Sequence, residues 1–384
     1  MNTKLHKLKV LTAIGTRPEI IRLSEVIKEF DRRFEHILVH TGQNYDYELN
    51  EIFFKELGLR KPDYVLGAGK KTDFSPVERT GFMLAEIDPI LRKETPDAFL
   101  VLGDTNSALS SYAAKRQKIP VFHMEAGNRC FDERVPEEVN RRVVDHVADI
   151  NMVYSERARD NLIAEGFPRD RIILTGSPMR EVIEAHQKEI DVSDVLSRLS
   201  LKRGEYFVVS CHREENVAEE NQLKKLADIL SRIADAYRYP IIFSAHPRTR
   251  AALEKSSVKL SEFVQVMKPL GFFDFMQLEQ NAYCTLSDSG TISEESSILD
   301  FPALNIREAH ERQEAMDEGS VMMVGLNPDR VMEALSFVRD DHGKKERTFR
   351  IPDAYASVNV SKKAARILLG YTDYVNRKVW MKDS

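Results

Sequence analysis

Three acidic side chains stand at positions from which an α/β protein can carry out acid–base chemistry. Glu125 follows the predicted strand Val121–Met124, and Gly103-Asp104 follows the apolar run Ala98–Leu102, so both acids come at the ends of predicted strands. Glu137 lies in the first turn of a helix-patterned segment. Carboxyl groups gathered at one edge of a sheet can exchange protons near neutral pH. These positions therefore predict an acid–base site.

The same acids have structural explanations that the sequence leaves open. An Asp before a helix is most often its N-cap, and this is the more frequent role for a residue placed as Asp104 is. Acidic residues in a first helical turn, such as Glu137 and Glu138, are stabilised by the helix dipole. Neither explanation fits Glu125, because it directly ends a buried strand. Glu125 is therefore the most informative of the three carboxylates.

A second group of residues has the chemistry that binds a diphosphate. Gly15-Thr16-Arg17-Pro18-Glu19 places a glycine turn and an arginine at a helix start, where free amides can hold an anion. The turn lacks the G-x-G-x-x-G pattern, which disfavours NAD binding. His212 and His246 follow two later strands, and Ser287-Asp288-Ser289-Gly290-Thr291 precedes a helix. A solvated arginine, structural histidines and a serine helix cap remain the alternatives at these places.

Strand and helix patterns alternate along the whole chain. Strands are expected at Lys9–Ile14, His36–His40, Ala98–Leu102, Val121–Met124, Ile150–Val153, Ile172–Leu174, Tyr206–Cys211, Ile241–Ser244, Val264–Met267 and Tyr283–Ser287. Helices are expected at Pro18–Phe30, Pro76–Arg92, Ser107–Lys115, Gln222–Ala236, Phe272–Gln280 and Ile292–Leu299. This alternation predicts an α/β protein with two doubly wound, Rossmann-like domains facing a cleft. We expect an N-terminal domain of residues 1–178, a C-terminal domain of residues 179–364, and a final helix, about 365–384, packed back on the first domain.

Composition bounds the class of protein. The chain has 384 residues, enough for two domains, and a formal net charge of −5 from 61 acidic and 56 basic residues. This balance argues against nucleic acid or an anionic membrane as a partner. Cys130, Cys211 and Cys284 are too scattered for a disulfide framework or a zinc site, which fits a reducing cytoplasm. No run approaches the roughly 20 apolar residues of a membrane span, so a soluble protein is expected.

Taken together, the segments resemble the non-hydrolysing UDP-N-acetylglucosamine 2-epimerases, which have the two-domain GT-B fold. The resemblance covers nearly the whole chain. The motifs that carry it are Gly15-Thr16-Arg17-Pro18-Glu19, Gly103-Asp104-Thr105, His123-Met124-Glu125-Ala126-Gly127, Pro136-Glu137-Glu138, His212-Arg213-Glu214, His246-Pro247 and Asp288-Ser289-Gly290. Each motif is modest alone, but their order and spacing are highly specific.

The resemblance implies a role for each matching residue. The implied catalytic residues are Asp104, Glu125, Glu137 and His212. The residues implied in binding the UDP-sugar are Arg17, Arg22, His246, Phe275, Ser289, Gly290, Glu295 and Arg312. Among these, Phe275 lines the uracil pocket, Glu295 binds the ribose hydroxyls, and Arg17, His212, Ser289 and Gly290 hold the phosphates. The implied partner is a UDP-sugar substrate, no metal or other cofactor is expected, and a homodimer is implied.

Some segments depart from the usual family pattern. The segment Asn128–Val135 is shorter than in the typical enzyme, and Gly290-Thr291 stands where a glycine pair is expected. Asn128–Asp132, Thr291–Ser297 and Tyr371–Arg377 resemble a subgroup that makes UDP-N-acetyl-L-fucosamine from the 2-epimeric 6-deoxy-L-talose sugar, for capsule or O-antigen. The alternative within the family is conversion of UDP-GlcNAc to UDP-ManNAc.

The chemistry of the sugar limits the mechanism. The C2–H of a hexosamine is not acidic enough for direct removal by a carboxylate, so UDP must leave C1 first or at the same time. We therefore expect anti elimination of UDP to a 2-acetamidoglycal, followed by re-addition. The competing interpretations are a GT-B glycosyltransferase, a hydrolysing epimerase and a non-catalytic UDP-sugar sensor.

Overall fold

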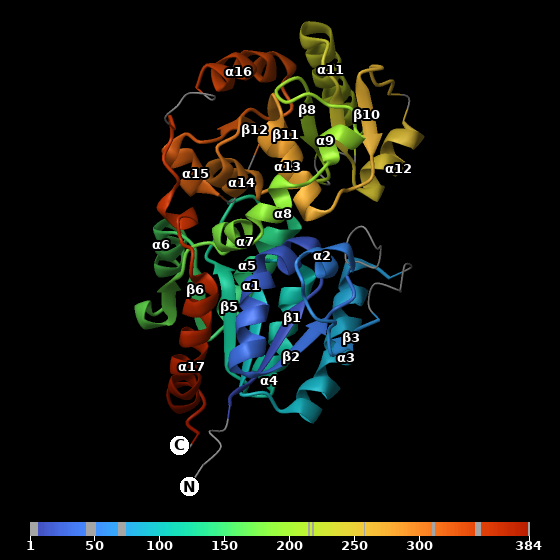
Figure 1. Cartoon of the computed structure of the whole chain (residues 1–384). Helices are drawn as coiled ribbons and strands as arrows, with labels where there is room; N and C mark the ends of the chain where they lie inside the picture. Colours follow the sequence, from blue (N-terminus) through green and yellow to red (C-terminus); the bar gives the residue numbers. More distant parts are fainter. Residues whose placement is uncertain are drawn as a thin grey trace. The chain divides into compact units, whose positions relative to one another are not determined.

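The chain folds into two units, each of which is a parallel sheet covered by helices (Figure 1). The computed structural model describes residues 7–43, 51–67, 74–213, 216, 219–256, 258–308, 312–341 and 347–382. Unit 1 consists of Met1–Ala185 together with Ala356–Ser384, and unit 2 consists of His186–Tyr355. The predicted fold class, α/β with two doubly wound Rossmann-like domains, is confirmed.

In its described residues, unit 1 has a seven-stranded sheet in the order β3-β2-β1-β4-β5-β6-β7. Its strands are β1 (Lys9–Ile14), β2 (Glu35–His40), β3 (Tyr64–Val65), β4 (Ala98–Leu102), β5 (Val121–Ala126), β6 (Ile150–Val153) and β7 (Ile172–Leu174). Its helices are α1 (Arg17–Arg33), α2 (Glu51–Glu56), α3 (Pro76–Glu94), α4 (Ser111–Arg116), α5 (Pro136–Val147), α6 (Glu156–Ala164), α7 (Met179–Ala185) and α17 (Val360–Lys378), with short 3-10 helices η3 (Asn106–Ser110) and η4 (Arg169–Arg171).

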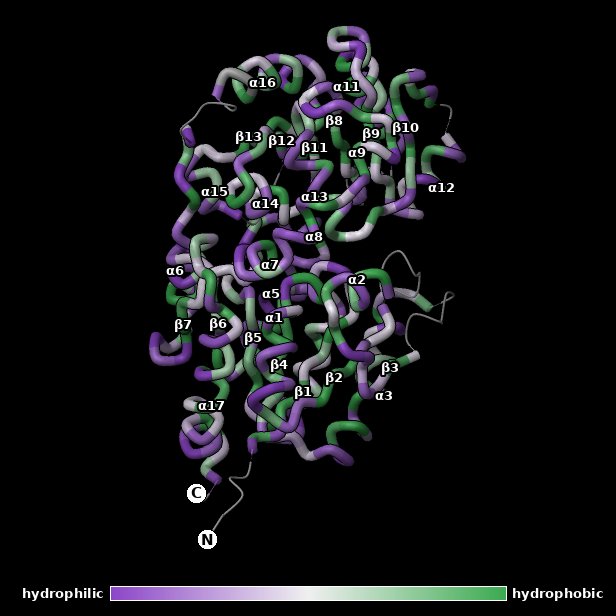
Figure 2. Tube along the Cα trace, viewed as in Figure 1, coloured by the Kyte–Doolittle hydropathy of each residue, from purple (hydrophilic) through white to green (hydrophobic). Residues whose placement is uncertain are grey.

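The central strands β4 and β5 of unit 1 are buried on both faces, as a parallel sheet between two helix layers requires. Every residue of β4 and β5 is buried, and Figure 2 shows the sheet strands as largely hydrophobic. Strand side chains such as Leu11, Val39, Phe99 and Val101 form one core cluster together with residues of α3. These strands are therefore rigid supports for the residues that follow them.

Unit 2 repeats the plan with a six-stranded sheet in the order β10-β9-β8-β11-β12-β13 in its described residues. Its strands are β8 (Phe207–Ser210), β9 (Ile241–Ser244), β10 (Val264–Met267), β11 (Cys284–Ser287), β12 (Ala303–Asn305) and β13 (Met322–Met323). Its helices are α8 (Gln187–Asp191), α9 (Val195–Arg198), α11 (Glu220–Tyr237), α12 (Pro247–Lys255), α13 (Phe272–Asn281), α14 (Ile292–Leu299), α15 (Gln313–Glu318) and α16 (Pro328–Asp341), with the 3-10 helix η5 (Asp353–Tyr355).

Each strand expected from the sequence is present, but two local expectations were wrong. Strand β5 does not end at Met124 but continues through Glu125 to Ala126. The helix expected at Ser107–Lys115 is split into η3 and α4, because a tight turn follows the end of β4. The short strands β3, β12 and β13 had no recognisable sequence pattern, since each is only two or three residues long.

The chain passes between the units after Ala185 and after Tyr355, whereas the expected borders were residues 178 and 364. Helix α7 stays with unit 1 because it packs on α1. Its Glu181 accepts a 2.8 Å hydrogen bond from the backbone N–H of Ser361, which fixes the returning chain to the same unit. From there α17 runs beside α1 as one continuous helix (Figure 1).

Candidate active site

Several of the predicted site residues lie close to the point where the strand order of each sheet reverses. In unit 1 this point lies between β1 and β4, and in unit 2 it lies between β8 and β11. Open parallel sheets bind their ligands beyond the carboxyl ends of the strands at such a reversal. Asp104 follows β4 and Glu125 is in the adjacent strand β5, while His212 and Ser289 follow β8 and β11. Each sheet thus presents chemically useful side chains at its ligand-binding end.

Glu125 is held in a backbone conformation that non-glycine residues rarely adopt. Its φ is +66°, in the left-handed region, and the pairing of β5 with β6 shifts between Met124 and Ala126. A bulge of this kind turns one side chain out of the sheet and costs free energy, so the surrounding structure must impose it. The carboxylate is 7% exposed and forms an ion pair with Arg22 of α1. Arg22, predicted as a sugar-binding residue, is thereby placed beside the most informative carboxylate.

Asp104 is an ion-pair partner rather than a helix cap. The residue that caps η3 is Thr105, whose hydroxyl accepts from the N–H of Ser107. The Asp104 carboxylate instead accepts from Nη2 and Nε of Arg141 in α5, at 2.5 and 3.1 Å. The capping explanation for Asp104 is therefore wrong, because the neighbouring threonine performs that role. Arg141 also ties the β4 end to the helix that carries Glu137.

The two acids at the start of α5 have different surroundings. Glu137 is half-buried, whereas the side chain of Glu138 is fully buried and accepts hydrogen bonds from Cys130 N–H, Arg141 and Arg142. Burial by itself disfavours the charged form of Glu138, but the Cys130 N–H and the charge of Arg141 outweigh it and hold its pKa below the usual value. Glu138 is thus a structural anion that anchors Arg141, while Glu137 remains the catalytic candidate on α5.

The turn after β1 is already occupied by a carboxylate of the chain itself. Glu19 accepts hydrogen bonds from the N–H groups of Gly15 and Thr16 at 2.6 and 2.7 Å, and a further one from the Thr105 hydroxyl. Burial raises the pKa of Glu19 to about 7, and these hydrogen bonds lower it only in part. The expectation of free amides at this turn was therefore wrong. A Cβ on Gly15 would lie 2.0 Å from the Thr41 hydroxyl, so only glycine fits there.

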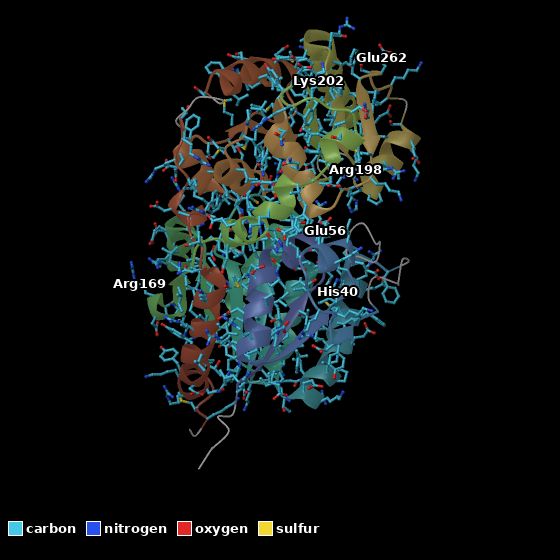
Figure 3. All side chains as sticks on the ribbon, in the orientation of Figure 1. His40, Glu56, Arg169, Arg198, Lys202 and Glu262 are labelled. Carbon is cyan, nitrogen blue, oxygen red and sulfur yellow. The ribbon has the colours of Figure 1, made fainter. Side chains whose placement is uncertain are left out.

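Arg17 and His40 lie at the same end of the sheet in unit 1. The Arg17 guanidinium lies 6.0 Å from the centre of the Phe53 ring and is half-buried, which leaves it placed for a phosphate contact. His40, at the end of β2, is labelled in Figure 3 and is 1% exposed. Burial lowers the pKa of His40 to about 4, and its Nδ1 accepts from Gly42 N–H. His40 is therefore neutral at pH 7 and adds no positive charge at this end of the sheet.

In unit 2, a buried aspartate organises the turn after β8. Asp288 accepts hydrogen bonds from the N–H groups of His212 and Arg213, both at 2.9 Å, and from the Asn216 amide at 3.1 Å. Its Oδ1 also lies 3.2 Å from His212 Nδ1. Burial alone would raise the pKa of Asp288, but His212 and the Arg213 N–H reverse this and lower it. The fixed anion orients the His212 ring and leaves Nε2 as its other hydrogen-bonding atom.

The segment after β11 supplies hydroxyl groups and a helix start. The Ser289 and Thr291 hydroxyls are 2.9 Å apart, and Gly290 between them is buried. Helix α14 begins at Ile292, so the loop stands at the positive end of an eight-residue helix, an arrangement that suits phosphate. Glu295 is 6% exposed and lies in the first turn of this helix.

Three further predicted residues of unit 2 lie in different surroundings. Arg312 is 1% exposed and forms a 3.2 Å ion pair with the fully buried Glu294. His246 is half-buried directly before α12, and Phe275 packs partly buried against the cluster that contains Tyr206. Glu214 of the His212-Arg213-Glu214 motif lies outside the described residues. No three His, Cys, Asp or Glu side chains among the described residues are grouped to hold a metal, and none of the described helices could span a membrane.

With this geometry established, comparison with known proteins decides the family. A family model described as UDP-N-acetylglucosamine 2-epimerase matches residues 28–369. The chain belongs to this family. A solved UDP-N-acetylglucosamine 2-epimerase from Rickettsia bellii is 49% identical with a TM-score of 0.91, covering 98% of this chain and 100% of that one. The Methanocaldococcus jannaschii UDP-GlcNAc 2-epimerase, solved in complex with UDP-GlcNAc and UDP, is 33% identical with a TM-score of 0.87, covering 94% and 100%.

A third relative shows that similar chains handle other acetamido sugars. The UDP-2,3-diacetamido-2,3-dideoxy-D-glucuronate 2-epimerase of Pseudomonas aeruginosa is 35% identical over 333 residues, 85% of this chain and 91% of that protein. The resemblance stated from the sequence is therefore confirmed at the level of the family, and the two-domain fold of this epimerase matches that of the solved relatives. As a member of the family it is an isomerase, a UDP-sugar 2-epimerase.

Several residues that shape the epimerase site were not assigned from the sequence. Glu19, His123, Arg141 and Asp288 fix the positions of candidate catalytic groups, as their hydrogen bonds show. Two of them had a sequence signal. Thr16 and Glu19 have the spacing of a capping box, and Asp288 directly follows an apolar strand. The positioning roles of His123 and Arg141 could not be read from the sequence, because their partners come from distant segments.

Proposed function

We propose that this epimerase inverts C2 of a UDP-N-acetylhexosamine by eliminating UDP and adding it back. The observation that carries the proposal is the placing of Asp104 and Glu125 at the ends of neighbouring strands, each paired with its own arginine. A Cβ on Gly103 would lie 3.9 Å from the Glu125 carboxyl group, so the two strand ends are close. Arg141 joins Asp104 to the helix of Glu137. These contacts support a cluster of three acid–base groups within one unit.

The proposed reaction has two half-steps that mirror each other. In the first, the C1–O bond breaks and UDP leaves with the bonding electron pair, so positive charge develops at C1 and acidifies C2–H. A carboxylate of unit 1 takes the C2 proton, giving a 2-acetamidoglycal. In the second, an acid delivers a proton to the opposite face of C2, and a β-phosphate oxygen of UDP bonds to C1 again. Substrate and product differ only at C2, so no oxidant, reductant or water is consumed.

The residues of unit 2 have the chemistry that the departing diphosphate requires. His212 is oriented by Asp288, and the Ser289-Gly290-Thr291 loop offers hydroxyl groups beside a helix start. Donors fixed in advance stabilise developing negative charge without having to reorganise. We assign His212, Ser289, Gly290 and Arg17 to the phosphates. Glu295 is assigned to the ribose and Phe275 to the uracil, and we keep His246 and Arg312 as substrate-binding candidates.

We propose UDP-N-acetyl-L-fucosamine as the product, made for capsule or O-antigen in the cytoplasm. The support is the segment after Glu125, which the sequence distinguishes from the typical family pattern. Within it Arg129 is buried and bound to Glu165 at 2.6 Å, whereas Phe131 is 63% exposed with a φ of +56°. We propose that this short segment, which Arg129 anchors next to the bulge at Glu125, determines which hexose is accepted. Conversion of UDP-GlcNAc to UDP-ManNAc is the alternative, and the names of the relatives favour it.

We also propose a homodimer. Val139 and Val143 lie one turn apart on α5 and are 52% and 44% exposed, and Tyr112 of the adjacent α4 is 52% exposed. Large apolar side chains exposed together favour association with a second copy. Light scattering coupled to gel filtration tests this, and a monomer at micromolar concentration would contradict it.

One experiment separates the proposed reactions. The protein is incubated in deuterated water with UDP-GlcNAc and, separately, with the UDP-linked 2-acetamido-2,6-dideoxy-L-talose sugar, and the products are followed by NMR. Deuterium at C2 of the epimer of the L-talose sugar supports the proposed product, whereas turnover of UDP-GlcNAc alone favours UDP-ManNAc. Free sugar would indicate a hydrolase. No turnover of either sugar would leave a transferase or a sensor.

A further inference from the structure

His123 of β5 is a buried side chain with a hydrogen-bond partner at each ring nitrogen. Its Nε2 lies 2.8 Å from the carbonyl oxygen of Gly103, and its Nδ1 lies 2.9 Å from Oδ1 of Asp145, with neither side chain exposed. A carbonyl oxygen and an ionised carboxylate both accept hydrogen bonds, so the two partners hold the ring between two acceptors. Both ring nitrogens of His123 are therefore engaged by other groups inside unit 1.

Asp145 belongs to a wider buried network. Its Oδ2 accepts from Arg129 Nη1 at 2.7 Å, and its carboxylate also accepts from the Gly127 N–H at 3.2 Å. Arg129 in turn binds Glu165 through two hydrogen bonds of 2.6 and 2.7 Å. Arg129 thus lies between two carboxylates, those of Asp145 and Glu165. Such a network is costly to break, because removing one partner leaves a buried charge without its counter-charge.

The network connects the three segments that carry the candidate catalytic acids. Gly103 directly precedes Asp104, and Gly127 follows Glu125 by two residues. Asp145 lies on α5, the helix that begins at Pro136 and carries Glu137. A shift of His123 or Asp145 would therefore move all three carboxylates relative to one another.

We propose that His123 and Asp145 are positioning residues that set the spacing of Asp104, Glu125 and Glu137. This inference rests on the proposed function for what those three carboxylates do. His123 is not itself an acid or base of the reaction, since it is fully buried and both ring nitrogens are engaged. A misplacement of about 1 Å at reacting groups can lower a rate by about 100-fold, so the spacing itself has catalytic value.

A matched control comes from Asp149, which ends the turn after α5. It is also buried, its Oδ2 accepts from the Val121 N–H at 3.0 Å, and it forms an ion pair with Lys115. Asp149 therefore holds the first residue of β5, whereas Asp145 holds the segment at the strand's other end. Asp149→Asn should destabilise unit 1 without moving the candidate acids.

The test compares Asp145→Asn, His123→Gln and Asp149→Asn in the full-length protein. Turnover of the UDP-sugar that the wild type accepts, UDP affinity by calorimetry, and melting temperature are measured for each. We expect kcat to fall about 10- to 100-fold for the first two variants, with KM and UDP affinity within about 2-fold, as for residues that orient catalytic groups. Asp149→Asn should keep kcat within about 2-fold at a comparable loss of melting temperature. Equal losses of kcat in Asp145→Asn and Asp149→Asn would overturn the proposal.

A second measurement does not depend on turnover. In histidine labelled with ¹⁵N, the His123 signals, identified by their loss in His123→Gln, should show both nitrogens protonated at neutral pH, and Asp145→Asn should leave one nitrogen unprotonated. A neutral His123 ring in the wild type would overturn the proposal that His123 and Asp145 act together as positioning residues. If the wild type turns over none of the UDP-N-acetylhexosamines while His123 is an imidazolium, the proposed function fails and the network stands as a structural finding only.

Discussion

The buried Glu19 makes the stability of this epimerase depend on pH in a way that one substitution should remove. Its carboxyl group is 1% exposed and accepts hydrogen bonds from Gly15, Thr16 and Thr105. Burial raises its pKa from the ordinary 4.5 to about 7. The folded state therefore holds a proton on Glu19 between these two values, whereas the unfolded chain has released it. Glu19→Gln keeps the size of the side chain and removes the titration.

The sign and size of the effect follow from linkage. Because the folded state binds more protons than the unfolded state, the free energy of unfolding falls as pH rises from about 4.5 to about 7. At roughly 1.4 kcal/mol for each unit of pKa, the raised pKa of Glu19 corresponds to about 3 kcal/mol. Between about pH 5 and about pH 8, we expect the free energy of unfolding of wild-type unit 1 to fall by about 2.5 kcal/mol more than that of Glu19→Gln.

The single tryptophan makes the assay specific for unit 1. Trp380 lies in this unit, with the Lys115 ammonium 5.0 Å from the centre of its ring, so its fluorescence follows unit 1 during urea unfolding. Glu25→Gln is the control on the same helix, because Glu25 is partly exposed and pairs at the surface with Lys28. Parallel loss of stability with pH in wild type and Glu19→Gln would refute the argument.

Three further predictions use other parts of the structure. Glu125→Gln should lower kcat by about 100-fold or more while UDP affinity by calorimetry changes less than about 2-fold, and unchanged turnover would remove Glu125 from the mechanism. Gly127→Ala should lower the free energy of unfolding in urea by about 3 kcal/mol or more, because the φ of Gly127 is +77° and an added Cβ would lie 2.3 Å from a backbone oxygen. Gly370→Ala is the control: it lies in an open helical position and should stabilise the protein by roughly 0.5–1 kcal/mol. Equal effects of the two substitutions would contradict the argument from backbone conformation. Glu294→Gln should destabilise unit 2 by about 3 kcal/mol in urea unfolding followed by circular dichroism, because it removes the buried carboxylate that forms an ion pair with Arg312, and a wild-type midpoint would be the contrary result.

The sequence predicted the strand ends because buried parallel strands have a clear signal. Runs such as Ala98–Leu102 are wholly apolar, so the first polar residue after them marks the edge at which ligands bind. This is why Asp104 and His212 could be placed at their strand ends without a structure. Glu125 was recognised as exceptional for the same reason, although its strand continues past it.

What could not be predicted depends on contacts between distant segments. Arg22 and Glu125 are 103 positions apart in the sequence, and the spacing of residues does not reveal such a pair. The bulge at Glu125 has a left-handed backbone conformation, which the sequence did not indicate because the residue is not a glycine. At Gly15 and Thr16 the sequence did carry a signal, because Thr16 and Glu19 have the spacing of a capping box. In the structure, Glu19 accepts hydrogen bonds from both backbone N–H groups. Asp104 likewise pairs with Arg141 instead of capping a helix because packing brings these two residues together, and their spacing in the sequence does not reveal this.

The central claim is that the bond between C1 and UDP breaks before C2 is inverted, and isotope exchange tests it directly. A UDP-N-acetylhexosamine that the protein accepts is prepared with ¹⁸O in the oxygen that bridges C1 and the β-phosphorus. After partial turnover, the account predicts that ¹⁸O appears in the non-bridging β-phosphate oxygens of the recovered UDP-sugar, because free rotation of the released phosphate makes its oxygens equivalent. Complete epimerisation with all ¹⁸O still in the bridge would contradict it.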